Sequence, residues 1–165
     1  MKRSLLIITV ALSLLTACRE ARYPIDEPAI VKIDTRLLGK WVALEKRDNI
    51  LGAADYDMVY KVTKQSDNKY KIIYKDGKKK RGEKTTAYLS DINNELFLNV
   101  YVDGDSSGYL FLKIISIDAD KIVMTGIADT TMEQLTSPSQ VRERITKNLH
   151  NPLFYKDTVE MDRVK

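Results

Sequence analysis

The feature that most constrains the fold of this chain is the alternation of apolar and polar side chains along successive segments. In residues 69–75, Tyr70, Ile72 and Tyr74 occupy every second position, and three of the other positions are lysines. Residues 56–64 repeat the pattern. A period of two places successive side chains on opposite faces of an extended chain. It therefore indicates β-strands with one face against a core and the other in water.

Seven segments of this kind precede residue 129, and short polar turns separate most of them. The expected strands cover residues 38–46, 56–64, 69–75, 83–90, 95–102, 109–117 and 121–128. Strands at this spacing indicate an antiparallel meander. Closing such a meander into a barrel removes its exposed edges.

The period changes after the seventh strand. Ser137-Pro138 predicts an N-cap followed by proline at the first helical position. Asn151-Pro152 ends the helix, and residues 158–165 form an expected last strand. One apolar stripe runs along the helix at intervals of four residues, through Val141, Ile145 and Leu149. We expect a mainly β fold: an antiparallel up-and-down barrel of eight strands, with one C-terminal helix before the last strand. An open half-barrel is the alternative.

The N-terminus has the features of an export signal. Two basic residues precede an almost unbroken apolar run over residues 4–15, which has the length of a signal-peptide core. A spanning helix needs about 20 apolar residues, so this run is too short to cross a membrane comfortably. The run ends in Leu15-Thr16-Ala17-Cys18, which resembles the bacterial lipobox, in which the cysteine thiol takes a diacylglycerol before cleavage. We expect residues 1–17 to be a lipoprotein signal peptide and Cys18 to be the lipid attachment site. An ordinary signal peptide with a chance cysteine is the alternative.

The remaining chain divides into a tether and one domain. Residues 18–36 contain two prolines, several charges and little periodicity, so we expect a flexible tether from acylated Cys18. Residues 37–165 form the expected barrel domain. No aspartate follows Cys18 directly. We therefore expect a lipid-anchored protein of the cell envelope, in the outer membrane and facing the periplasm, with surface exposure as the alternative.

Charge excludes one class of partner. Removing the two basic residues of the signal from the chain's 27 leaves the mature part almost balanced against its 23 acidic residues. Nucleic-acid binding needs a dense basic face, so we expect no nucleic-acid partner. One basic cluster, Lys78-Lys79-Lys80-Arg81, follows a turn signal. It is interpreted as a solvated hairpin tip, with contact to anionic headgroups or polysaccharide as the alternative.

Residues suited to catalysis or metal binding are few. Cys18 is the only cysteine and His150 the only histidine, so neither a Cys–His pair nor a zinc site can be built. Asp103–Gly108 resembles the start of a calcium loop, but the twelfth position is Ile114 where a glutamate is required. We therefore expect no catalytic residue, no metal, no cofactor and no enzymatic activity. An enzyme with a carboxylate-based site is the alternative, although no pair of carboxylates is marked out.

Gly39-Lys40-Trp41 lies in the first expected strand. Lipocalins and other calycins carry a Gly-x-Trp at this place and a helix near the C-terminus, and the chain resembles them, most of all the small lipocalin-like lipoproteins of Gram-negative bacteria. The resemblance implies that Trp41 plugs one end of the barrel beneath an arginine, for which Arg163 is a candidate. It also implies a small apolar ligand inside the barrel.

If Trp41 points inward, large side chains of several strands point inward with it. They either fill the core or line a ligand cavity, and buried tyrosine hydroxyls favour a polar-lined cavity. We expect a non-enzymatic envelope protein that binds a small apolar or amphipathic ligand. The alternative is a protein-interaction module, such as an assembly factor or an enzyme inhibitor. The expected ligand-binding residues are Trp41, Tyr60, Tyr70, Tyr74, Leu98 and Leu112.

Replacing Cys18 tests the predicted lipid attachment and membrane anchoring. We expect Cys18→Ala to abolish incorporation of radiolabelled palmitate in bacteria that express the full chain, because the chain has no other thiol. The protein should also leave the membrane fraction. Ser13→Ala, in the apolar run, is the matched control and should keep both. Label in Cys18→Ala, or none in the unchanged protein, would refute the assignment.

Overall fold

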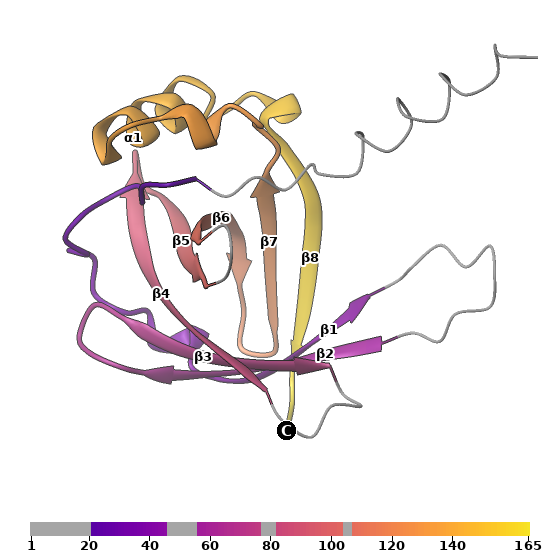
Figure 1. Ribbon diagram of the computed structural model, residues 1–165. Coiled ribbons are helices and arrows are strands. Elements are labelled where there is room, and N and C mark those ends of the chain that lie inside the picture. Colours follow the sequence, from indigo (N-terminus) through magenta and orange to yellow (C-terminus); the bar gives the residue numbers. More distant parts are fainter. Residues whose placement is uncertain (1–20, 46–55, 77–81, 104–106) are drawn as a thin grey trace, which may run out of the picture.

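Eight strands, β1–β8, and a single longer helix, α1, organise the part of the chain that the computed structural model describes, residues 21–45, 56–76, 82–103 and 107–165. The strands form one closed barrel in sequence order, and every neighbouring pair is antiparallel (Figure 1). This confirms the up-and-down barrel and excludes the half-barrel. The strands are β1 (Gly39–Glu45), β2 (Tyr56–Lys64), β3 (Tyr70–Asp76), β4 (Glu83–Ile92), β5 (Glu95–Val102), β6 (Gly108–Ile117), β7 (Lys121–Ile127) and β8 (Tyr155–Arg163).

Two ends of the barrel are distinguished below. The closed end is where β1, β3, β5 and β7 begin, and it includes Gly39 and Tyr70. The mouth is the opposite end, where these strands finish, and it includes Val102 and Gly108. Three short 3-10 turns complete the described elements: η2 (Thr35–Leu37), η3 (Met132–Gln134) and η4 (Pro152–Phe154).

The last strand differs most from the prediction. It covers Tyr155–Arg163, whereas the sequence pattern predicted residues 158–165. Thr125 pairs with Thr158 and Gly126 with Lys156, so Asp157 is the extra residue of a β-bulge. Its φ of 55° is one that aspartate tolerates better than most residues. A bulge shifts the alternation by one position, which hid the first residues of the strand.

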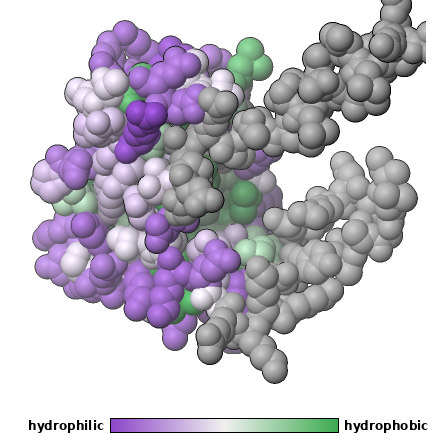
Figure 2. Space-filling view, in the orientation of Figure 1, coloured by the Kyte–Doolittle hydropathy of each residue, from purple (hydrophilic) through white to green (hydrophobic). Residues whose placement is uncertain are grey.

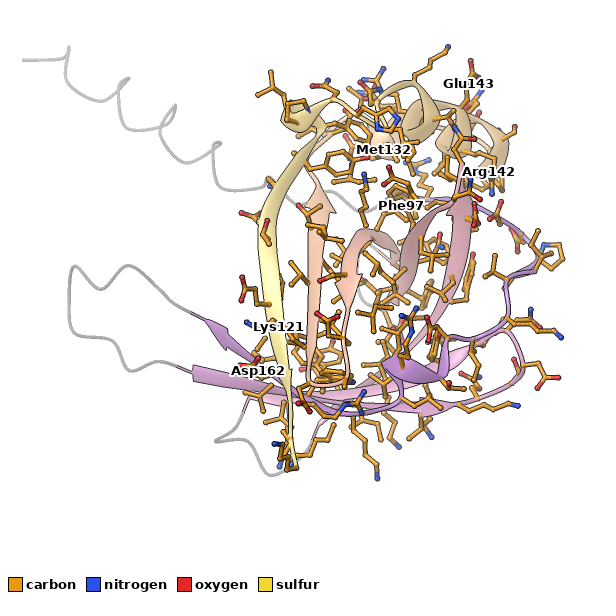
Figure 3. All side chains as sticks on the ribbon, turned by 180° about the vertical axis from the view of Figure 1, so that it is seen from behind. Phe97, Lys121, Met132, Arg142, Glu143 and Asp162 are labelled. Atoms are coloured by element: carbon orange, nitrogen blue, oxygen red, sulfur yellow. The ribbon has the colours of Figure 1, made fainter. Side chains whose placement is uncertain are left out.

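The helix begins where it was predicted and ends at Lys147, before the Asn151-Pro152 stop, so that Leu149 lies just beyond it. α1 (Pro138–Lys147) begins after Ser137, whose Oγ accepts a hydrogen bond from the Gln140 backbone N–H at 3.3 Å. The apolar stripe packs on the outer face of the barrel. It forms one buried cluster with residues of the strap region, the barrel wall and the turns beside the helix, which are Ala21, Ile25, Ile92, Phe97, Phe111, Met132 and Phe154. Figure 3 shows Phe97 and Met132 beneath the helix. The barrel therefore has two cores, one inside and one between its wall and α1.

The expected flexible tether is ordered from Ala21 onward. We call residues 21–37 the strap, because they run along the outside of the barrel to the start of β1 (Figure 1). Ala21 is 2 % exposed and Ile25 is 1 % exposed. The Ile25 backbone N–H donates to Oδ1 of the buried Asn99 at 2.9 Å. The sequence pattern did not predict this packing, because apolar residues without periodicity can still be buried against the barrel wall.

Trp41 and Arg163 close one end of the barrel. The Arg163 guanidinium carbon lies 4.1 Å from the centroid of the fully buried Trp41 ring, as the resemblance implies. Its nitrogens donate to the carbonyl oxygens of Leu38 at 2.8 Å and Arg36 at 2.7 Å. Gly39 has a φ of 137°, and a Cβ there would lie 2.5 Å from Arg163 Nη1. The glycine of Gly-x-Trp is thus needed for both its backbone angle and the approach of the arginine.

Removing the guanidinium should weaken the barrel. We expect Arg163→Met to lower the free energy of unfolding by about 2–3 kcal/mol, because a cation–π contact and charge-assisted hydrogen bonds are lost together. Urea unfolding followed by circular dichroism measures the change. Arg22→Met, at an exposed residue of the strap, is the matched control. Equal small losses in the two variants would show that Arg163 does not hold the closed end.

Candidate functional site

The barrel encloses a cavity of about 560 Å³, which lies within the usual range for a small-molecule site. The interior is therefore hollow rather than filled by side chains. Strands and the η2 turn contribute the lining residues, which are mostly apolar. They are Leu37, Met58, Tyr60, Val62, Tyr70, Ile72, Tyr74, Glu83, Lys84, Thr85, Leu98, Val100, Tyr101, Val102, Asp103, Leu110, Leu112, Ile122, Met124, Val159 and Met161.

The outside contrasts with this interior. Figure 2 shows a mainly hydrophilic surface interrupted by a few hydrophobic patches. Alternation along the strands explains the contrast, because residues of opposite parity face opposite sides of a sheet. In β3, for example, Ile72 is buried inside while its neighbour Lys71 is exposed.

Tyr70 forms part of the cavity floor near the closed end. Its side chain is fully buried. The hydroxyl accepts a hydrogen bond from the Asp34 backbone N–H at 2.6 Å and donates to the Asp34 carbonyl oxygen at 3.2 Å. Burial raises the pKa of the Tyr70 phenol to about 12. The floor therefore presents an apolar ring whose hydroxyl is already engaged by the strap.

The polar lining residues gather toward the mouth. The Tyr74 hydroxyl donates to Glu83 Oε2 at 2.8 Å, and this hydrogen bond raises the Tyr74 pKa. The rings of Tyr74 and Tyr60 are stacked with centroids 6.3 Å apart. Lys84 and Asp103 add one charge of each sign to the lining. The cavity is thus apolar in its depth and carries hydrogen-bonding groups where it meets solvent.

The structure brings together five of the six residues expected to bind a ligand. Tyr60, Tyr70, Tyr74, Leu98 and Leu112 all line the cavity. Trp41 is buried in the closed end beneath Arg163 and is not among the lining residues. Trp41 therefore lies below the cavity floor, and it does not line the cavity as a ligand-binding residue was expected to do.

Several lining residues were missed by the sequence analysis. Met58, Val62 and Val100 lie two positions from residues that were chosen, so the same alternation could have identified them. Leu37 lies in the η2 turn, where no strand period operates. Glu83 and Thr85 were missed because polar residues of a weak strand do not reveal which face they occupy.

The other residues singled out in the sequence lie outside the cavity or outside the described residues. Cys18, the basic cluster 78–81 and residues 104–106 of the Asp103–Gly108 loop lie outside the described residues. The His150 side chain is 82 % exposed, and its Nδ1 is 3.8 Å from Glu95 Oε1. Among the described residues, no three His, Cys, Asp or Glu side chains gather in a metal-binding group. In the same part of the chain no helix combines the length and apolar character needed to cross a bilayer.

Fold and cavity define the class: an up-and-down β-barrel of eight strands with a hollow, mainly apolar interior. Comparison with models of known families, with curated proteins and with solved structures finds no match. The functional argument therefore depends on the residues of this chain alone.

The buried phenol of Tyr70 predicts a loss of stability at high pH. Its pKa of about 12 in the folded protein exceeds the value near 10 of an unfolded chain. The resulting stabilisation is present below pH 10 and is lost as the pH rises toward 12. We expect Tyr70→Phe to reduce this loss by up to about 1.4 kcal/mol per pH unit, in urea unfolding measured from pH 7 to 12.

At pH 7 the same variant should be less stable by about 1 kcal/mol, because the Asp34 backbone groups lose their partner. Tyr23→Phe, at a ring 37 % exposed, controls for loss of a phenol hydroxyl at this pH. An unchanged slope above pH 10 in Tyr70→Phe would refute the role assigned to this hydroxyl.

Proposed function

We propose that this protein is a lipid-anchored envelope protein whose barrel binds a small apolar or amphipathic ligand, without catalysing a reaction on it. The cavity of about 560 Å³ is the observation that carries the proposal. An empty interior is costly, because its lining loses packing contacts that a filled core would make. A ligand that fills the space restores those contacts.

A lipocalin-like interpretation is supported by the closed end. Gly39, Trp41 and Arg163 have the relationship that the resemblance implies, with the guanidinium over the ring and the glycine making room for it. The helix, however, stands between β7 and β8 rather than after the eighth strand. We therefore propose a variant of the lipocalin-like barrel, anchored through Cys18 in the outer membrane and facing the periplasm.

The distribution of polar groups favours an amphipathic ligand. Apolar residues such as Ile72, Leu98 and Met124 line the depth, and the Tyr74–Glu83 pair lies toward the mouth. A ligand with an alkyl chain and a polar head would bury the chain and leave the head near hydrogen-bonding groups.

A series of single-chain lipids tests this proposal. Each buried CH₂ contributes about 0.8 kcal/mol, so affinity should rise up to about fourfold per methylene until the cavity is full and then level off. Isothermal titration with fatty acids and lysophospholipids of increasing chain length measures the dependence. Native mass spectrometry of the protein purified from its own membranes should show a copurified lipid.

Filling the cavity provides the matched variant. Leu112→Trp places a larger ring in the lining, and we expect at least a tenfold loss of affinity. Ile115→Trp makes a similar change at a residue 56 % exposed and should bind as the unchanged protein does. No binding by any member of the series would refute ligand storage and favour the protein-interaction alternative.

A further inference from the structure

We propose that the mouth of the barrel rests on the bilayer that holds the Cys18 lipid, so that the cavity exchanges its ligand directly with that bilayer. This inference depends on the proposed lipid anchor and adds an orientation to it. The partner of the mouth surface is a phospholipid membrane. The main evidence is the position of the first described residue of the strap, Ala21, beside the mouth.

The strap is fixed to the barrel at the mouth. Ala21 and Tyr109 form an antiparallel bridge, with Ala21 N–H to Tyr109 O at 3.0 Å and Tyr109 N–H to Ala21 O at 2.8 Å. Tyr109 is the second residue of β6, directly after the β5–β6 connection. Cys18 precedes Ala21 by three residues, which span at most about 11 Å. The lipid attachment point therefore lies close to the mouth.

Further contacts hold the strap against the barrel, so that it does not lengthen the free chain between the lipid and the domain. Ile25 is bonded to Asn99 in the middle of β5, and the Tyr88 hydroxyl donates to the Asp26 carbonyl oxygen at 2.7 Å. The Asp26 carboxylate accepts hydrogen bonds from Arg142 of α1 at 2.7 and 2.8 Å. Detaching the strap would break these bonds and expose Ile25. The free length thus stays near three residues.

The surface beside this attachment point is suited to a lipid interface. Tyr101 is 38 % exposed and Leu110 is 39 % exposed, and both line the cavity near the mouth. The rings of Tyr101 and Tyr109 meet edge to face with centroids 5.5 Å apart. Tyrosine favours the membrane–water boundary because its ring is apolar and its hydroxyl is polar. A large aliphatic side chain beside tyrosines is typical of a surface that enters headgroups.

The closed end of the barrel lies too far from the mouth to touch the same membrane. β6 has ten residues, which span about 30 Å along the strand and roughly 20–25 Å along the axis of a tilted barrel. Ile30 marks that far end, since its carbonyl oxygen accepts from Asn68 in the β2–β3 turn at 2.9 Å. It is 67 % exposed, which makes it a matched aliphatic site for comparison with Leu110.

Quenching of tryptophan by brominated phospholipid measures the orientation. The acylated protein is placed in vesicles of phosphatidylethanolamine and phosphatidylglycerol with brominated chains. Trp41 is the only tryptophan and lies in the closed end, so the unchanged protein should be quenched little. We expect Leu110→Trp to lose most of its added emission and Ile30→Trp to lose almost none.

Two outcomes overturn the proposal. Equal quenching of the two variants would place the barrel on its side or away from the bilayer, and stronger quenching of Ile30→Trp would invert it. Flotation with the vesicles reports the anchor separately. If the cell does not acylate Cys18, coupling its thiol to a maleimide phospholipid in the same vesicles still reads the orientation. Failure of the tether and failure of the mouth surface are thereby distinguished, and titration with free lipids reports ligand binding independently.

Discussion

The contact between the Arg163 guanidinium and the Trp41 ring is the constraint on which the rest of the barrel depends. These two residues are register partners in the β1–β8 pair, so the same contact joins the first strand to the last. It also turns one end of the barrel into a solid plug. Because that end is filled by a ring and a guanidinium, the remaining interior can stay hollow without becoming an open channel.

The buried polar side chains of the barrel are paired in hydrogen bonds. Asn99 is fully buried, yet its amide bonds the strap at Ile25 and its Nδ2 donates to Ser90 Oγ at 2.9 Å. Among the described residues, no buried side-chain nitrogen or oxygen lacks a hydrogen-bond partner. Each unpaired group would cost about 1–3 kcal/mol. The strap therefore supplies a hydrogen bond that a buried polar side chain needs. A chain that lacked the strap would leave Asn99 Oδ1 without the Ile25 N–H donor.

Strands with regular alternation were predicted well from the sequence. β2 and β5 have the predicted bounds, and the helix cap at Ser137 formed as expected. What the sequence could not show was set by tertiary contacts. The bulge at Asp157 broke the period of β8, and the strap acquired order only from a wall built by residues far along the chain. In the candidate site, parity identified the tyrosines and leucines, but not that space would remain between them.

The position of the closing strand has a consequence for how the chain reaches this state. β8 reaches β1 only after the long connection that contains α1, so the seam joins the two ends of the domain. Pairings between distant segments make folding slow, because loop-closure entropy is lost before the contact forms. Until the C-terminal residues arrive, β1 and β7 present unpaired edges, which are templates for aggregation. A chain of this design therefore keeps two aggregation-prone edges until the nine residues of β8 are in place.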